Sequence, residues 1–266
     1  MLDSYNRKIN YLRISVTDRC NLRCRYCMPE EGIQLIRHED VLSYEEILEI
    51  TEVAVGYGID KVRITGGEPL ARKNVVALVK MLATINEIRD LSMTTNGTLL
   101  RDYSMELKNA GLHRLNISLD TINPAEYKKL TRFGNVIDVF NGIDEAKRVG
   151  FDKIKINTVI ENSPEEKNAK EVAEYAAKEN LEIRFIRKMD LVNGQFWVVQ
   201  GGKGGDCEIC NRLRLSCDGI IRPCLFSDIG FSVKELGIET ALLNALKHKP
   251  EKGHINKTTT FYGLGG

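Results

Sequence analysis

The sequence predicts an α/β fold built on a parallel sheet. Short apolar segments typical of strands alternate with amphipathic helical segments, and this unit of about thirty residues recurs six times before residue 190. Strands that alternate with helices favour a parallel sheet with right-handed crossovers. An open or partial (β/α)6 barrel and a flat, doubly wound sheet both fit this pattern, and periodicity alone does not separate them.

The individual elements follow from local signals in chain order. The predicted strands are 11–17, 61–65, 91–96, 114–120, 153–160 and 182–189. The first helix begins at a capping box, in which Ser43 is the N-cap and Glu46 stands three residues later. Further helices are predicted near 74–83, 102–110, 136–149 and 165–179, with Gly111 and Gly150 at two of their ends. The glycine-rich segment 191–206 has no clear element, and a last helix is predicted near 232–247.

Length and composition restrict the class of protein. The chain has 266 residues, of which 42% are hydrophobic and 28% charged, and its net charge is +1. This length fits one large α/β domain with a small appendage. The charge gives no general reason to expect binding to nucleic acid or to an anionic membrane. The sequence has no long apolar run, and residues 1–8 lack the apolar core of a signal peptide, so we expect a cytoplasmic protein.

The seven cysteines fall into two groups, three within 20–27 and four within 207–224. A chain without an export signal is expected in a reducing compartment, where a disulfide framework is not favoured. Two separate groups of thiols therefore indicate two metal centres.

The first group, Cys20, Cys24 and Cys27, lies in the loop that leaves the C-terminal end of the first strand, where α/β folds place their chemistry. Three thiolates on one short loop can hold three irons of a [4Fe–4S] cube and leave the fourth iron open to a small molecule. A structural zinc site would need a fourth protein ligand. The nearest candidate, His38, stands too far beyond Cys27 for a usual zinc spacing.

The C-x3-C-x2-C spacing, with Tyr26 before the last cysteine, resembles the radical S-adenosylmethionine superfamily. The resemblance implies that the amino and carboxylate groups of S-adenosylmethionine chelate the open iron. One electron then breaks the bond between sulfur and C5′, and the resulting 5′-deoxyadenosyl radical removes a hydrogen atom from a substrate. The superfamily also favours the partial barrel over the flat sheet.

Two strand ends carry small polar motifs. Gly66, Gly67 and Glu68 follow the second strand, where paired glycines allow close approach of the backbone to a ligand and Glu68 adds an acceptor. A tight turn is the alternative, but after the cysteine loop this motif resembles the superfamily's GGEP motif, which holds the methionyl amino group. Gly67 is then the residue closest to the cofactor. Ser118, at the end of the fourth strand, either contacts the cofactor or caps the next turn.

Four basic residues stand inside apolar strands: Arg13, Arg63, Lys155 and Arg184. Long cations within barrel strands are costly if they are buried without a partner. They either pair with aspartate and glutamate or converge on a polyanion inside the barrel, where several cations suit a triphosphate. The sequence leaves both interpretations open.

The second cysteine group contains a C-x2-C pair, Cys207 and Cys210, followed by Cys217 and Cys224. Four cysteines could bind zinc, which remains the simpler alternative. The surrounding pattern is C-x2-C-N-R-L-R-L-x3-G-x4-C-L-F. Together with T-D-R-C-N-L-R-C-x-Y-C-M-P near the start and a terminal Gly-Gly, it resembles the GTP 3′,8-cyclases of molybdenum-cofactor biosynthesis.

This family resemblance implies a second [4Fe–4S] cluster on Cys207, Cys210 and Cys224, with an open iron that binds the purine of GTP. Cys217 is then a small core residue. The chain divides into a partial barrel, 1–190, and a C-terminal region, 191–266, that binds the auxiliary cluster and ends in the Gly-Gly tail.

The resemblance also assigns roles residue by residue. The residues expected to contact S-adenosylmethionine are Tyr26, Gly66, Gly67, Glu68, Ser118 and Met189. Contacts to GTP fall on Arg13, Arg63, Thr94, Lys155, Arg184, Arg212 and Arg214. Catalytic roles fall on Arg212, Arg214, Gly265 and Gly266, the last two as a tail that enters the active site.

The implied reaction takes a hydrogen atom from C3′ of GTP, after which C3′ attacks C8 and gives (8S)-3′,8-cyclo-7,8-dihydroguanosine 5′-triphosphate. The implied partners are a flavodoxin or ferredoxin-type electron donor and a downstream cyclic pyranopterin monophosphate synthase, and a homodimer is a possible assembly.

Two departures from the family keep a second hypothesis open. The segment between Met189 and Cys207 is several tens of residues shorter than is usual, and Arg187 stands where the family has an acid. A radical S-adenosylmethionine maturase acting on a peptide or another nucleotide is therefore the alternative. A zinc protein without enzymatic activity is the third.

Overall fold

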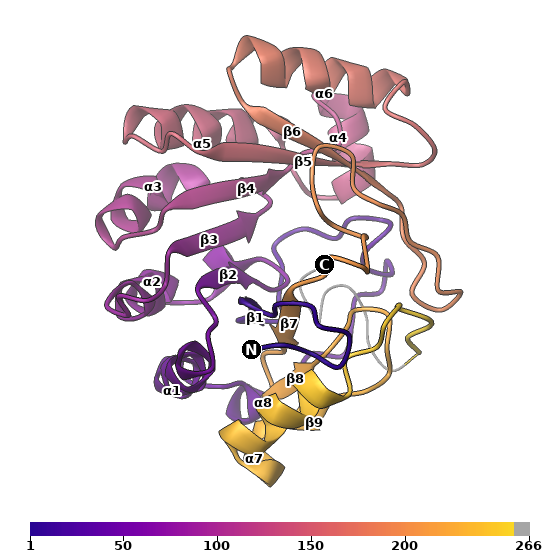
Figure 1. Ribbon diagram of the computed structural model, residues 1–266. Coiled ribbons are helices and arrows are strands. Elements are labelled where there is room, and N and C mark those ends of the chain that lie inside the picture. Colours follow the sequence, from indigo (N-terminus) through magenta and orange to yellow (C-terminus); the bar gives the residue numbers. More distant parts are fainter. Residues whose placement is uncertain (258–266) are drawn as a thin grey trace.

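The computed structural model describes residues 1–257, and a single nine-stranded sheet runs through it in the order β6-β5-β4-β3-β2-β1-β7-β8-β9. Six parallel strands follow one another in chain order from the middle of the sheet to one edge: β1 (Tyr11–Ser15), β2 (Lys61–Thr65), β3 (Asp90–Thr95), β4 (Arg114–Ser118), β5 (Ile154–Ile160) and β6 (Glu182–Arg187). The sheet curves without closing, which confirms the predicted partial barrel (Figure 1).

The long helices cover the convex face of this sheet and leave its concave face to the interior (Figure 1). They are α1 (Tyr44–Gly56), α2 (Val75–Ala83), α3 (Leu100–Asn109), α5 (Val136–Arg148) and α6 (Lys167–Lys178). The capping box that starts α1 is present, because the Ser43 hydroxyl accepts from the backbone N–H of Glu46 and the Glu46 carboxylate accepts from the N–H of Ser43. No helix within residues 1–257 is both long and apolar enough to cross a membrane.

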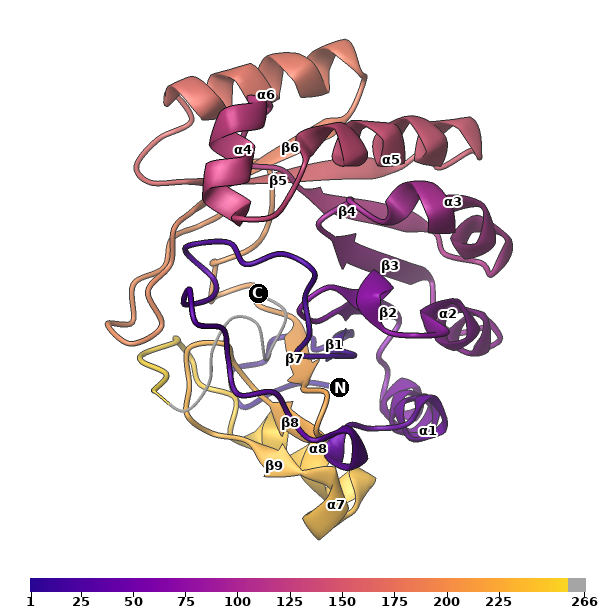
Figure 2. The same cartoon turned by 180° about the vertical axis from the view of Figure 1, so that it is seen from behind.

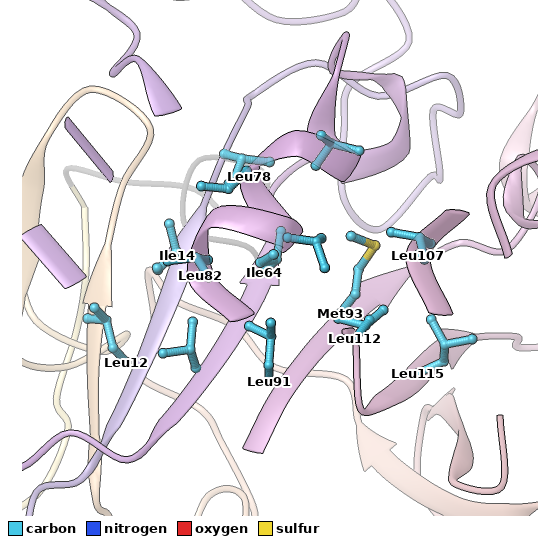
Figure 3. Packing of buried hydrophobic residues seen from close by; sticks show 14 of the residues in the cluster. Leu12, Ile14, Ile64, Leu78, Leu82, Leu91, Met93, Leu107, Leu112 and Leu115 are labelled. Atoms are coloured by element: carbon cyan, nitrogen blue, oxygen red, sulfur yellow. The ribbon is translucent and has the colours of Figure 1, made fainter. Parts of the chain in front are cut away.

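Successive side chains along each strand alternate between the hydrophobic core under the helices and the concave side of the barrel. One set of side chains points outward, where it is buried beneath α2 and α3; the opposite set faces the inside of the barrel. Figure 3 shows the outward set, in which members of neighbouring strands pack side by side against leucines of the two helices. The residues labelled there on the strands are Leu12, Ile14, Ile64, Leu91, Met93 and Leu115, and those on or next to the helices are Leu78, Leu82, Leu107 and Leu112.

Two segments differ from the prediction. A helix that was not predicted, α4 (Pro124–Thr131), precedes α5. Its N-cap is Asn123, whose side-chain oxygen accepts hydrogen bonds from the backbone N–H groups of Ala125 and Glu126 in the first turn. The helix expected near 232–247 is interrupted at Gly237, which separates α7 (Val233–Leu236) from α8 (Ile238–Lys247). Gly237 has φ +79°, a left-handed conformation that ends the first short helix.

The C-terminal region continues the barrel sheet, whereas the sequence predicted no strands there. Strand β7 (Arg212–Leu215) pairs in parallel with β1, and β8 (Ile220–Arg222) and β9 (Phe231–Ser232) follow as antiparallel neighbours. The functional division at residue 190 stays a prediction, since one sheet contains strands from both parts. Gly265 and Gly266 of the expected tail lie outside the described residues.

Candidate active site

A cavity of about 870 Å³ occupies the concave side of the sheet. Its walls come from the strands β1 to β7, from the loop after β1, and from the segment that follows β6. It brings together most of the residues predicted for the site: Arg13, Cys20, Cys24, Tyr26, Cys27, Arg63, Gly66, Gly67, Thr94, Ser118, Lys155, Arg184, Met189, Cys207, Cys210, Arg212, Arg214 and Cys224. Among the described residues, Glu68 is the one predicted site residue that does not line it.

The loop with the first three cysteines is held against α4, the helix that the sequence did not reveal. The backbone N–H groups of Arg23 and Arg25 donate to the carbonyls of Thr131 and Leu130, at 3.1 and 3.0 Å. The guanidinium of Arg132 donates to the carbonyls of Arg23 and Met28. Figure 2 shows this loop crossing in front of the barrel beside α4. The helix end therefore fixes a loop that has no regular structure of its own.

The three thiols of this loop are free and partly buried along the cavity wall. Burial raises the pKa of Cys20 to about 11 and that of Cys27 to about 12, and it also raises the pKa of Cys24. Thiols buried in this way are stable as thiolates when a cation compensates their charge. No three His, Cys, Asp or Glu side chains within residues 1–257 converge on one metal ion. In a four-iron cube each thiolate binds a different iron, and the donor set fits this group.

The Gly66–Glu68 segment lies directly against the start of the cysteine loop. The N–H of Gly67 donates to the Thr17 carbonyl at 2.7 Å, and the N–H of Glu68 donates to the Arg19 carbonyl at 2.8 Å. A Cβ on Gly67 would stand 2.4 Å from that Arg19 oxygen. The absence of a side chain at Gly67 thus allows two loops to meet at the cavity wall.

Glu68 is placed differently from the expectation that it offers its carboxylate to a ligand. It is 1% exposed, and its two oxygens accept from the N–H of Leu70, the hydroxyl of Thr95 and the N–H of Asn96. Burial raises its pKa to about 7, against the lowering effect of these donors. The carboxylate therefore ties the end of β2 to the end of β3, and through this link it positions Gly67.

Tyr26 and Asp120 form a buried pair beside the cysteines. The Tyr26 hydroxyl donates to the Asp120 carboxylate at 2.8 Å, and the N–H of Val159 donates to the other oxygen. Burial raises the pKa of Asp120 to about 6. This pair orients the Tyr26 ring in the cavity wall, and Ser118 lies on the same wall at the end of β4.

Three arginines form a row across adjacent strands. In the parallel register Arg13 of β1 is paired with Arg63 of β2 on one side and with Arg214 of β7 on the other. Each is less than 10% exposed. Burial, followed by the neighbouring guanidinium groups, lowers the pKa of Arg13, and burial lowers that of Arg214 to about 10. Like charges gathered in this way at a cavity wall suit an anionic ligand.

Some of the other cations on the strands pair with acidic side chains, which was one of the two interpretations that the sequence left open. Lys155 forms an ion pair with Glu182, and Arg114 forms one with Asp90 at 2.6 Å. Even so, eleven lysines and arginines line the cavity, against three aspartates and glutamates, in a chain whose net charge is +1. Cations therefore outnumber acids at the cavity wall. Pairing with an acid is found for Lys155, whereas the binding of a polyanion stays a prediction.

Two buried hydroxyls of the cavity wall, those of Tyr11 and Thr94, have no hydrogen-bond partner within the described residues. Thr94 was among the predicted GTP contacts, whereas Tyr11 was missed. Tyr11 stands two residues before Arg13 on β1 and so faces the same side of the sheet. The Arg63 guanidinium lies over its ring, 5.5 Å from the ring centroid. Buried polar groups without partners are expected where a ligand supplies them.

The second cysteine group opens onto the other end of the same cavity. Cys207, Cys210 and Cys224 line it, whereas Cys217 is fully buried elsewhere, with its carbonyl accepting from the N–H of Leu42 at 2.8 Å. Burial raises the pKa of Cys210, but Lys249 and Arg212 more than offset this, so it lies below its ordinary value.

Sequence reasoning missed four residues that matter for this geometry: Tyr11, Arg114, Asn157 and Lys249. The first three could have been found from strand alternation. Tyr11 has the same parity as Arg13 on β1, Arg114 the same parity as Ser118 on β4, and Asn157 the same parity as Lys155 on β5. Lys249 follows a helix outside any motif, and no local signal identifies it.

Comparisons with known proteins agree with this geometry. A family model described as "Radical SAM superfamily" matches residues 14–176. A protein named GTP 3′,8-cyclase from Thermodesulfovibrio yellowstonii is 42% identical, over 89% of this chain and 88% of that protein. One of the same name from Petrotoga mobilis is 41% identical, over 98% of this chain and 97% of that protein. The latter alignment extends over 313 positions, so the relative contains residues without a counterpart here.

Solved structures support the fold. Streptococcus suis SuiB, in a structure described as bound to S-adenosylmethionine, superposes with a TM-score of 0.67 over 94% of this chain and 66% of that chain, at 15% identity. Methylornithine synthase (PylB) superposes with a TM-score of 0.55 over 69% of this chain and 54% of that chain, at 18% identity. At sequence identities this low, the superpositions support the fold and say nothing about function.

Proposed function

This chain belongs to the GTP 3′,8-cyclase family of radical S-adenosylmethionine enzymes, and from this membership we propose that it converts GTP to (8S)-3′,8-cyclo-7,8-dihydroguanosine 5′-triphosphate in molybdenum-cofactor biosynthesis. The membership implies a [4Fe–4S] cluster and S-adenosylmethionine, which when bound supply a 5′-deoxyadenosyl radical. Cys20, Cys24 and Cys27 would hold the cluster.

The chain's own residues would bind and orient the two small molecules. Gly66, Gly67, Ser118 and Met189 would contact S-adenosylmethionine beside the Tyr26 ring, with Glu68 fixing the glycines from behind. The cations Arg13, Arg63, Lys155, Arg184, Arg212 and Arg214, with the hydroxyl of Thr94, would hold GTP. In the barrel interior these charges act at short range with little competition from bulk water.

We further propose the second [4Fe–4S] cluster on Cys207, Cys210 and Cys224, facing the purine of GTP. Arg212 and Arg214 and the tail residues Gly265 and Gly266 would assist the radical step. A flavodoxin or ferredoxin-type donor would supply the electron, a cyclic pyranopterin monophosphate synthase would take the product, and the reducing cytoplasm is the proposed location.

The observation that carries this proposal is one cavity that joins three thiols at one end, three at the other and an excess of cations between them. The test is a mass spectrum of the products from GTP, S-adenosylmethionine and a reductant under anaerobic conditions. Formation of 5′-deoxyadenosine together with cyclised GTP supports it. Formation of 5′-deoxyadenosine without any GTP product would favour the peptide maturase, an alternative that the names of the curated relatives do not support.

The strand cations are expected to bind the triphosphate. Lys155→Ala and Arg184→Ala should each weaken GTP binding by about 1.5–3 kcal/mol, because a charge-assisted contact is lost in a partly buried site. Calorimetric titration with GTP and GMP measures this, and the loss should be smaller with GMP. Lys147→Ala is the matched control, since Lys147 pairs with Glu179 on the outer helices, away from the cavity. Unchanged GTP affinity in both cavity variants would contradict the assignment.

Cys217 is expected to be a core residue and not a ligand. Cys217→Ser should retain about eight irons per chain, as two four-iron clusters require. It should also lower the free energy of unfolding by about 1–3 kcal/mol, because a hydroxyl replaces a sulfur that is 0% exposed. Iron analysis and thermal unfolding check both outcomes. A loss of about four irons would make Cys217 a ligand of the second cluster.

A further inference from the structure

Lys249 is a buried cation that contacts the second cysteine group, although it lies outside residues 207–224 in the sequence. It follows α8 and is 3% exposed. Its ammonium donates to the carbonyls of Arg212 and Pro223, at 2.8 and 2.7 Å, and to the Sγ of Cys210 at 3.5 Å. Pro223 immediately precedes Cys224 and Arg212 stands two residues after Cys210. One ammonium group thus joins the chain around two predicted ligands.

The charge of this ammonium is not compensated by a carboxylate. Within residues 1–257 no aspartate or glutamate forms an ion pair with Lys249. Carbonyl dipoles solvate a buried cation incompletely, and an uncompensated buried charge is costly. The Cys210 sulfur is the contact that can carry a negative charge, which it does as the thiolate ligand of a metal.

A second buried cation nearby shows the contrast. Arg7 donates to the carbonyls of Cys207, Pro250 and Glu251, and it forms an ion pair with Asp3 at 2.6 Å. Arg7 therefore ties the same region together and has its own counter-charge. Lys249 makes comparable backbone contacts, but its third donor is directed at a sulfur. A purely architectural role would not require that contact.

We propose that Lys249 is a positioning residue of the second cluster: it fixes the segments that carry Cys210 and Cys224, and it supplies the positive charge that sets the reduction potential of the cluster. The inference rests on the proposed second cluster. Hydrogen bonds to the sulfurs of an iron–sulfur cluster and a nearby positive charge stabilise the reduced, more negative state, and so they raise the potential.

The test compares Lys249→Gln with Lys249→Met and Lys249→Arg in the fully loaded protein. Glutamine keeps hydrogen-bond donors for the carbonyls but lacks the charge. A redox titration followed by electron paramagnetic resonance measures the reduction potential of the second cluster. In the Gln and Met variants the equilibrium constant for its reduction should fall at least tenfold, so the potential becomes more negative. That shift corresponds to about 59 mV for one electron. It should be smaller in the Arg variant.

Two internal controls accompany this measurement. The first cluster of the same molecules should keep its wild-type potential, because Lys249 contacts Cys210 of the second group and is not among the residues that line the cavity. Lys108→Gln removes a lysine that donates to the Gly150 carbonyl at 2.6 Å on the outside of the barrel. It should leave both potentials unchanged.

A measurement on the wild-type protein keeps the inference testable if a variant fails to fold. In protein with 15N-labelled lysine, pulsed electron paramagnetic resonance of the reduced second cluster should detect a nitrogen coupling, and this coupling should disappear in Lys249→Arg. No coupling in the wild type, or a wild-type potential in Lys249→Gln, would overturn the inference. A wild-type protein that retains about four irons instead of about eight would overturn the second cluster itself.

Discussion

Replacing Cys20, Cys24 or Cys27 by alanine is expected to abolish the formation of 5′-deoxyadenosine. Each thiolate would hold a different iron of the first cluster, so the loss of one leaves the cube with two protein ligands. A cluster held in this way neither remains bound nor presents a single open iron to S-adenosylmethionine. Chromatography of the nucleoside products under reducing conditions measures the effect, and iron analysis should show a loss of about four irons per chain.

Cys217→Ser is the matched control for these three variants. It changes the same residue type in the same chain, but Cys217 lies in the core away from the cavity. It should cleave S-adenosylmethionine at close to the wild-type rate per bound cluster. Wild-type cleavage in any of the three alanine variants would show that the first metal centre is assigned to the wrong residues.

Gly67→Ala is expected to lower the cleavage of S-adenosylmethionine per bound cluster by about a hundredfold. The new Cβ would stand 2.4 Å from the Arg19 oxygen and 2.9 Å from the Asp18 oxygen. These are backbone atoms, so the clash is relieved only if the Gly66–Glu68 segment and the start of the cysteine loop move apart. A displacement of about 1 Å in a reacting group costs about that factor in rate.

The control for this variant is Gly56→Ala, because a Cβ on Gly56 meets no atom within 4 Å. Gly56 ends α1 on the outside of the barrel. Thermal unfolding should show a loss of about 1–3 kcal/mol for Gly67→Ala, as for other overpacked positions, and little change for Gly56→Ala. If Gly67→Ala cleaves S-adenosylmethionine at the wild-type rate per cluster, the glycine is not needed for the loop contact.

Features encoded by short-range patterns could be predicted from the sequence. The strand Lys61–Thr65 and the capping box of Ser43 and Glu46 were predicted as they are found, because apolar alternation and capping depend on neighbouring residues. The spacing of the first three cysteines predicted an iron–sulfur cluster, in agreement with the match to the radical SAM superfamily. The sequence also singled out Arg13 and Arg63 as cations within apolar strands, without deciding their role, and both line the cavity.

Features that depend on contacts between distant segments could not be predicted. The sequence suggests that Glu68 contacts a ligand, but its carboxylate accepts hydrogen bonds from Thr95, the last residue of β3, and from Asn96, which follows that strand. The pairing of β7 with β1 joins segments two hundred positions apart, and no local pattern specifies which strand is the neighbour. Helix α4 is short and weakly amphipathic, so its role in holding the cysteine loop appears only in three dimensions.

The pairing of β1 with β7 also has a consequence for the order of folding. During synthesis β1 is made among the first residues, yet one of its edges stays without a partner until Arg212–Leu215 leave the ribosome. Contacts of such long sequence separation form late because loop closure must precede them. An unpaired inner strand is open to incorrect pairing with other chains. The row of Arg13, Arg63 and Arg214 likewise cannot assemble in a partial chain. The end of the cavity that Cys207, Cys210 and Cys224 line therefore forms only after most of the chain has been synthesised.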